Sequence, residues 1–275
     1  KKRPKEGRHL PCPSLSESMR LTFLGTGTSQ GVPLLACSCR VCTSADPRDR
    51  RFRSSVWIED PPLSIVIDTS PDFRSQALRA GIPRLDAVLY THSHADHIAG
   101  FDDLRTYSVK NGNRIPIYAD PFTLSRLEKA FDYAFNVRER SPAYVCPEPH
   151  PITGPFSIGP LTFTPLPVPH GTITTTGFRM DHHGQPRVAY LPDCAAVPGT
   201  IRDLIRQIPV LVIDGLREEP HPTHLTIAQA IEISQDVRAA QTWLTHLTHQ
   251  TLHAERDATL PPPIRLAYDS LQLSL

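Results

Sequence analysis

The sequence predicts an α/β protein in which sheets and helices pack in layers. Short apolar runs recur along the chain with capped, helix-like segments between them, an alternation that is typical of βαβ units. The 275 residues suffice for one large domain built on two sheets. Many of the 29 prolines lie in short connections such as Pro61-Pro62, where they stiffen loops. We therefore expect a single folded domain over residues 19–275.

Residues 1–18 differ from the rest of the chain. This segment is basic and contains prolines but shows no hydrophobic period, so we expect a disordered or loosely held N-terminal extension. A predicted strand begins abruptly after it, and Met19 is interpreted as the functional start. A nucleic-acid-binding arm is the alternative role for the extension.

Short apolar runs bounded by turn residues predict the strands. In chain order they are residues 20–24, 55–59, 64–68, 87–91, 115–119, 161–165, 176–180, 187–191, 210–214, 242–245, 264–268 and 271–275. The last two are separated by Asp269-Ser270, which predicts a turn. His182-His183-Gly184-Gln185 contains a glycine between two strands, so we expect a hairpin tip there and not a metal site.

Helices are predicted where a cap precedes an apolar period. Ser70 offers an N-cap and Pro71 a proline at the first helical position, residues 72–80 carry the period, and Gly81 ends it. Similar patterns predict three further helices, near residues 121–134, 198–207 and 226–237.

Charge and hydropathy restrict the classes of function. The chain has 29 Lys and Arg against 28 Asp and Glu, a net charge of +1, which does not indicate a broad nucleic-acid-binding surface and favours small substrates. No stretch approaches the roughly 18 consecutive apolar residues of a membrane helix. The N-terminus also lacks the apolar core of a secretory signal, so we expect a cytoplasmic protein that does not bind a membrane.

The strongest indication of chemistry is the segment Thr91-His92-Ser93-His94-Ala95-Asp96-His97. Directly after a predicted strand, it supplies four potential metal ligands, His92, His94, Asp96 and His97. Imidazole and carboxylate groups suit Zn²⁺ and related cations, and sites of α/β proteins collect at this end of the strands. The alternative, a polar loop that happens to be rich in histidine, does not explain why the ligands are so close together.

This segment resembles the His-x-His-x-Asp-His signature of the metallo-β-lactamase superfamily, whose further ligands follow downstream. His170, Asp193 and His246 each come just after a predicted strand, as that resemblance requires. Taken singly, such residues are more often ordinary polar groups, but their shared position supports the match. The resemblance implies a four-layer αββα sandwich over residues 19–275. It also implies that Asp68, at the end of a strand, supports the ligands from outside the ligand set.

The resemblance further implies a dinuclear site for two divalent metals, zinc or manganese. One metal would be held by His92, His94 and His170, and the other by Asp96, His97 and His246, with Asp193 as the bridge. Two metals about 3.5 to 4 Å apart can share a hydroxide as nucleophile and neutralise charge on the attacked and leaving oxygens. Such a pair suits phosphodiester hydrolysis, and Asp96 would then be a catalytic residue as well as a ligand.

A second metal signature is Cys37-Ser38-Cys39-Arg40-Val41-Cys42. Three thiols this close suit one soft cation, such as a structural zinc, better than disulfides, because the expected compartment is reducing. The fourth ligand would come from one of four candidates, His249, Cys146, Cys12 or His253. A set of free thiols is the alternative interpretation.

Two further segments narrow the resemblance. Leu24-Gly25-Thr26-Gly27-Thr28-Ser29-Gln30-Gly31-Val32-Pro33 before the thiols, and Thr245-His246-Leu247-Thr248-His249, resemble the PhnP family of phosphoribosyl cyclic phosphodiesterases. That family hydrolyses a cyclic phosphodiester of ribose and is similar to the tRNA-processing ribonuclease Z. The resemblance implies a structural zinc held by Cys37, Cys39, Cys42 and His249, and a homodimer. It also implies a general acid at His224, with His221 as the rival.

The leading hypothesis is therefore a metal-dependent hydrolase of small, cyclic or activated phosphodiesters. A ribonuclease Z-type nuclease is the first alternative, but the chain has no long basic or glycine-rich insertion to grip tRNA, so nucleic acid is not the favoured partner. Thioester or lactam hydrolysis and sulfur oxygenation are the other chemistries on this fold. A non-catalytic metal-binding protein is the alternative from another class.

Overall fold

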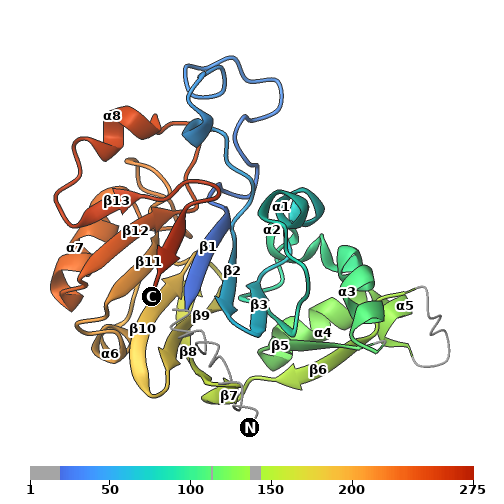
Figure 1. The fold of residues 1–275 in the computed structure, drawn as a ribbon. Coiled ribbons are helices and arrows are strands. Elements are labelled where there is room, and N and C mark those ends of the chain that lie inside the picture. The colour runs from blue at the N-terminus through green and yellow to red at the C-terminus, as the bar shows by residue number, and fades with distance from the viewer. Residues whose placement is uncertain (1–18, 113, 137–143) are drawn as a thin grey trace, which may run out of the picture.

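The computed structural model describes residues 19–112, 114–136 and 144–275. In these ranges two seven-stranded sheets pack face to face, with helices on both outer faces. Figure 1 shows α1 to α5 on one side of the pair of sheets and α6 and α7 on the other. The expected four-layer αββα sandwich is confirmed. The expected extension, residues 1–18, lies outside the described residues.

The first sheet combines antiparallel and parallel pairs in the order β14-β1-β2-β3-β4-β5-β6. Its strands are β14 (Gln272–Ser274), β1 (Arg20–Gly25), β2 (Ser55–Asp60), β3 (Leu63–Ile67), β4 (Ala87–Leu89), β5 (Ile115–Ala119) and β6 (Pro147–Pro151). The pairs from β3 to β6 are parallel, and the others are antiparallel.

The second sheet has the order β13-β12-β11-β10-β9-β8-β7. Its strands are β13 (Ile264–Leu266), β12 (Gln241–Thr245), β11 (Val210–Asp214), β10 (Gln185–Leu191), β9 (Ile173–His182), β8 (Leu161–His170) and β7 (Phe156–Ile158). The pairs from β10 to β13 are parallel, and β7 to β10 form an antiparallel meander.

Strands of both sheets are buried on both faces. In β11, Val210 and Val212 face the core between the sheets, whereas Leu211 and Ile213 face the outer helices. In β3, Ile65 faces the inter-sheet core and neighbouring residues face the helices of the first sheet. Continuous apolar runs such as these are expected where helices cover a sheet, because both faces must be removed from water.

The helices complete the outer layers. They are α1 (Phe73–Ala80), α2 (Ala95–Ile98), α3 (Arg105–Lys110), α4 (Pro121–Ala130), α5 (Asp132–Phe135), α6 (Gly199–Leu204), α7 (Ile227–Val237) and α8 (His253–Asp257), with 3₁₀ turns η1 (Pro47–Asp49) and η2 (Phe101–Leu104). Helix α7 begins with a complete capping box, in which Thr226 and Gln229 each satisfy a backbone N–H of the other. None of the helices within the described ranges combines the length and apolar character needed to span a bilayer.

Two sequence predictions of helix boundaries were wrong. Helix α1 begins at Phe73 after Asp72 instead of placing Pro71 at its first position, while Gly81 does end it in the left-handed conformation with φ 68°. The single helix predicted over residues 121–134 is divided at Phe131, whose backbone leaves the helical region.

The strands also differ from the sequence interpretation at the end of the chain and between residues 147 and 158. The last two strands do not pair with each other: β13 extends the second sheet and β14 the first, so the chain crosses between sheets near Asp269. Strands β6 and β7 were not predicted: three of the five residues of β6 are proline, and β7 has only three residues. Strand β6 lies at the edge of the first sheet, where prolines are tolerated. The hairpin tip at His183-Gly184 is confirmed.

Loss of packing between the sheets should be costly. Phe163 is fully buried there, stacks on Phe156 at 5.3 Å and meets Phe178 edge-on at 6.4 Å. We expect Phe163→Ala to lower the free energy of unfolding by about 3–5 kcal/mol, because it removes apolar contacts and leaves a cavity. Leu78→Ala, at a side chain that is 66% exposed, should change it by less than about 0.5 kcal/mol. Urea denaturation followed by circular dichroism measures both, and equal midpoints for the two variants would contradict this assignment of the core.

Candidate metal centre

Residues at the ends of several strands converge at one edge of the sandwich. His170 is the last residue of β8, Asp193 follows β10, and His246 follows β12. These strands run in the same direction within the second sheet, so their carboxyl ends share an edge. The loop after β4, from the first sheet, reaches the same edge, where the Thr176 N–H donates to the Thr91 carbonyl at 2.8 Å.

All seven residues expected in the dinuclear site lie together there. They form two groups, His92, His94 and His170 in one, and Asp96, His97, Asp193 and His246 in the other, with one ligand atom of each residue within 4.8 Å of the others in its group. The division into groups is the one that the resemblance implies, with Asp193 placed in the second.

One carboxylate oxygen faces both groups. Asp193 Oδ2 lies 3.3 Å from His97 Nε2 in the second group, and 3.9 Å and 4.0 Å from the Nε2 atoms of His92 and His170 in the first. Its other oxygen, Oδ1, lies 3.1 Å from His246 Nδ1. This position between the groups is the one that a bridging ligand requires.

Four buried polar atoms at this site make no hydrogen bond of normal geometry among the described residues, although two of them, His97 Nε2 and Asp193 Oδ1, lie within 3.3 Å of a side-chain oxygen or nitrogen of another residue of the site. The four atoms are the Nε2 atoms of His92, His97 and His246 and Oδ1 of Asp193, all on side chains that are at most 2% exposed. Leaving such atoms without a partner costs free energy, and a folded protein avoids it. Convergent imidazole and carboxylate donors that lack partners fit a pair of divalent cations.

Hydrogen bonds from outside the ligand groups orient the imidazoles. Asp68 Oδ2 accepts from His97 Nδ1 at 2.7 Å and from the Thr91 hydroxyl at 2.8 Å, and its Oδ1 accepts from the Thr91 N–H at 2.8 Å. His170 Nδ1 donates to the Thr223 carbonyl at 2.7 Å. Each bond fixes one ring nitrogen as the donor and leaves the other free to bind a cation.

Two of these residues have unusual backbone conformations. Asp68 has φ 65° and His246 has φ 60°, in the left-handed region that non-glycine residues rarely adopt. Such conformations cost on the order of 1–3 kcal/mol and collect at functional sites, where the surrounding structure holds them.

The electrostatic environment keeps several ligands in the form that a cation needs. Burial lowers the pKa of His92 well below its usual value and the pKa of His246 to about 3, which favours the neutral imidazole at both. Burial would also lower the pKa of His97, but Asp193 and the other nearby carboxylates outweigh it and raise that pKa well above its usual value. Burial alone would raise the pKa of Asp193, but the nearby His246 and His97 outweigh it and hold that pKa well below its usual range. Neutral imidazole and ionised carboxylate are the metal-binding forms.

His224, the expected general acid, lies beside the ligand groups. Its ring is stacked 4.8 Å from that of His246 and meets His170 edge-on at 4.7 Å. Its Nδ1 lies 2.7 Å from Asp214 Oδ2. Burial lowers the pKa of His224, but the hydrogen bond to Asp214 outweighs it and the pKa is raised. The rival, His221, is more exposed and bonds to its neighbour Thr223 instead.

Asp214 is the site residue that the sequence interpretation missed. It is fully buried at the end of β11, and its Oδ2 also accepts from the Cys194 N–H at 3.1 Å. The signal was available, because Asp214 ends an apolar strand as Asp68 and Asp193 do. Its histidine partner, however, lies ten residues on in a loop, and no spacing rule links the two.

The three expected thiols form a second cluster with His249. The Sγ atoms of Cys37 and Cys39 lie 3.4 Å from His249 Nδ1, and that of Cys42 lies 3.7 Å from it. All four ligand atoms lie within 4.8 Å of one another, and the thiols are not joined by disulfides. This donor set, which we call the thiol site, fits a tetrahedral zinc.

The other candidates for a fourth ligand are placed differently. His253 lies against Tyr268, and its N–H donates to Asp49, while the backbone of Cys146 bonds to Ser108 beside β6. Cys12 lies outside the described residues. The Cys42 N–H, which donates to Cys39 Sγ, lowers the pKa of the Cys39 thiol to about 6 and favours the thiolate that binds metals.

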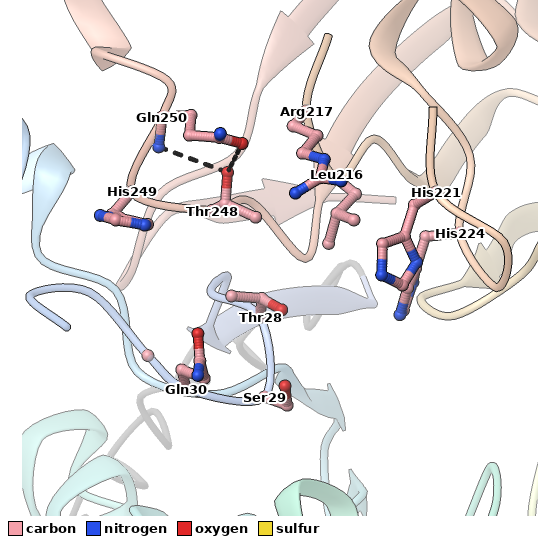
Figure 2. Close-up of a pocket in the computed structure, with 11 residues that line it drawn as sticks. Thr28, Ser29, Gln30, Leu216, Arg217, His221, His224, Thr248, His249 and Gln250 are labelled. Atoms are coloured by element: carbon pink, nitrogen blue, oxygen red, sulfur yellow. Dashed lines mark hydrogen bonds between the residues drawn. The ribbon is translucent and has the colours of Figure 1, made fainter. Parts of the chain in front are cut away.

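A polar cavity of about 310 Å³ lies between the two sites. Figure 2 shows Thr28, Ser29 and Gln30 on one wall, Thr248, His249 and Gln250 across from them, and His221 and His224 at one end. Arg217 also lines the cavity, where its guanidinium donates to the carbonyls of Glu219 and Pro220 at 3.3 Å. Among the described residues that line the cavity there is no carboxylate, so Arg217 gives it a positive character.

Comparisons with known proteins agree with this geometry. The family model of the beta-lactamase superfamily domain matches residues 64–247. An octanoyltransferase of Porphyromonas gingivalis is 39% identical over 259 residues, which cover 92% of this chain and 51% of that protein. This chain thus spans about half the length of that relative.

Solved structures of similar proteins have the same fold. A crystal structure of a diphosphatase from the PhnP family is 39% identical, with a TM-score of 0.86 over 94% of this chain and 98% of the other. Human tRNase Z, short form, shares the fold at a TM-score of 0.67 and 19% identity, over 93% of this chain and 98% of the other. The chain therefore belongs to the metallo-β-lactamase superfamily and, within it, to the PhnP family.

Proposed function

We propose that this protein is a metal-dependent phosphodiesterase of small substrates, with cyclic phosphodiesters of ribose as the leading candidates. The observation that carries the proposal is the position of Asp193 Oδ2 between two groups of ligand atoms, beside a cavity with a cationic lining. A pair of divalent cations bound there would supply an activated water and neutralise charge on the phosphoryl oxygens. Zinc or manganese suits the donors.

The residues of the chain have separate tasks in this reaction. His92, His94 and His170 would hold one cation, and Asp96, His97 and His246 the other, with Asp193 shared between them. Because Asp68 fixes the ring of His97, and the Thr223 carbonyl fixes that of His170, the ligands are oriented before the substrate arrives.

His224 is the proposed general acid. Its Nδ1 is engaged by Asp214, so its Nε2 remains to donate a proton to the leaving oxygen of the substrate. Arg217 would attract the negative charge of the bound substrate, since no carboxylate of the described lining compensates its charge.

The size and chemistry of the cavity favour a small polar substrate. Most of its lining side chains carry hydroxyl, amide, guanidinium or imidazole groups. Among the described residues that line it, only three histidines, His221, His224 and His249, have a ring on which an unstacked base could lie. This observation favours a small phosphodiester over a tRNA. The related diphosphatase extends the candidates to compounds with a diphosphate linkage, and the related octanoyltransferase makes an octanoyl thioester a substrate to be tested.

The first prediction concerns activity. With Zn²⁺ or Mn²⁺ added, the purified protein should hydrolyse bis(p-nitrophenyl) phosphate and a ribose cyclic phosphate, and chelation should abolish both activities. His94→Ala should also abolish them because it removes a ligand. The far-UV circular dichroism of this variant should be unchanged, because His94 is exposed.

Parallel assays with a diphosphate, a precursor tRNA and an octanoyl thioester test the alternatives. If the protein turned over one of these with metal and hydrolysed neither phosphodiester, the proposed phosphodiesterase activity would be refuted and that substrate class would take its place. If His94→Ala instead unfolded the protein with no loss specific to activity, a purely structural metal centre would be indicated.

The second prediction concerns His224. In His224→Gln, hydrolysis of the ribose cyclic phosphate should fall by about 100-fold or more, because a ribose alkoxide needs a proton to leave. Hydrolysis of bis(p-nitrophenyl) phosphate should fall much less, since p-nitrophenolate is a stable anion. His221→Gln is the matched control and should show no such difference. Equal losses on the two substrates would rule out His224 as the acid.

The third prediction concerns metal content. Elemental analysis of the purified protein should find about three cations per chain, two in the dinuclear site and one zinc in the thiol site. Cys39→Ser should remove one of them and lower the melting temperature while the other two remain. Retention of all three cations in this variant would show that the thiols do not form a metal site.

A further inference from the structure

Arg51 is a charged side chain at a position where packing alone would favour an apolar one. Its side chain has no exposed surface, and its guanidinium pairs with Asp49 Oδ1 at 3.2 Å. Burying such a pair carries a large desolvation cost, so it rarely stabilises a fold as well as an apolar pair would. The particular atoms that Arg51 and Asp49 contact indicate why the charges are there.

The guanidinium contacts the carbonyls on either side of His249. Arg51 Nη1 donates to the Thr248 carbonyl at 3.1 Å, and Nη2 donates to the Thr251 carbonyl at 2.9 Å. Asp49 Oδ1 accepts from the His253 N–H at 2.8 Å, further along the same loop. The pair therefore holds the loop of residues 248–253, and with it the histidine of the thiol site.

The same two residues hold the loop that carries the cysteines. Asp49 Oδ2 accepts from the Ser44 hydroxyl at 2.7 Å, two residues after Cys42. The Arg51 backbone forms two hydrogen bonds with Val32, at 2.8 Å and 2.9 Å, before Cys37. Both ends of the cysteine loop and both sides of His249 are thus fixed to one ion pair.

The walls of the cavity depend on the same pair. The wall of residues 28–31 packs on the extended segment of residues 51–53, which precedes β2. The Gly27 N–H donates to the Phe52 carbonyl at 2.7 Å, and a Cβ at Gly27 would lie 2.9 Å from Arg51 Cβ. The opposite wall, which includes Thr248 and Gln250, is held by the guanidinium.

We propose that Arg51 and Asp49 are a positioning pair that sets the distance between the loop that carries Cys37, Cys39 and Cys42 and the loop of residues 248–253. The pair thereby determines both the affinity of the thiol site for its cation and the width of the substrate cavity. The effect on the cavity rests on the proposed function, whereas the effect on the thiol site does not.

Arg51→Lys tests the pair while keeping the positive charge. A lysine presents one ammonium in place of the planar fork and cannot reach both carbonyls with the same geometry. We expect the affinity for Cd²⁺, measured through thiolate-to-metal charge-transfer absorption of the full chain, to fall by about 10- to 100-fold. With bis(p-nitrophenyl) phosphate, KM should rise more than kcat falls, because the guanidinium holds the loop at Thr248 and Thr251, beside the cavity and after His246.

Arg179→Lys is the matched control. Arg179 also pairs with an aspartate two residues away, Asp181, at 2.8 Å, and donates to a backbone carbonyl, that of Leu204, at 2.9 Å, but it lies on β9 away from both loops. The Arg179→Lys variant should have a lower melting temperature but an unchanged Cd²⁺ affinity and an unchanged KM. If Arg51→Lys behaved in the same way, the proposal would be overturned.

Asp49→Asn decides the matter if Arg51→Lys does not fold. It keeps an acceptor oxygen for the loop N–H but removes the charge that compensates Arg51, so Cd²⁺ affinity should fall by a smaller factor. Unchanged Cd²⁺ affinity in a folded Asp49→Asn would overturn the proposal. A different result is that the wild-type protein hydrolyses neither phosphodiester while the variants still lose Cd²⁺ affinity. That result would refute the proposed function and leave the positioning role of the pair at the thiol site intact.

Discussion

The carboxylate of Asp193 is the group around which the rest of the site is arranged. It is buried at the meeting point of imidazoles from both sheets, and its Oδ2 atom faces both groups of ligands. A buried carboxylate without cations beside it would be very costly, and neutral imidazoles compensate it only in part. Cations bound at this position would compensate the buried charge.

That constraint explains the architecture of the strand ends. Parallel order in the second sheet brings the ends of β10, β11 and β12 to one edge, and each end carries a residue of the site. Asp193 follows the first, Asp214 ends the second, and His246 follows the third. The loop after β12 then continues to His249, so a single short loop supplies residues to both the candidate metal centre and the thiol site. Any movement of this loop would affect both.

Much of this arrangement could be predicted from the sequence. The compact cluster from His92 to His97 after an apolar strand indicated a metal site by its chemistry alone, and apolar runs placed His170, Asp193 and His246 at strand ends. The division into two groups and the choice of His249 came from a family resemblance, because no spacing rule relates residues so distant in the chain.

Other features depend on contacts that only the folded chain provides. Arg51 is an ordinary basic residue in the sequence, and its burial follows from loops that meet around it. The apolar runs that end the chain are alike, yet one strand joins each sheet, because the crossover at Asp269 is held by backbone N–H groups of Thr26 and Phe52. Local pattern specifies a strand but not the sheet to which it belongs.

The proline-rich strand β6 has a consequence for the behaviour of the protein in solution. Pro147, Pro149 and Pro151 occupy alternate positions, and backbone N–H groups of alternate residues point to the same side of a strand. Glu148 and His150 keep their N–H groups for pairing with β5. The outward side of β6 therefore lacks backbone N–H donors. This disfavours pairing with a strand of another molecule and so opposes edge-to-edge aggregation at this end of the first sheet.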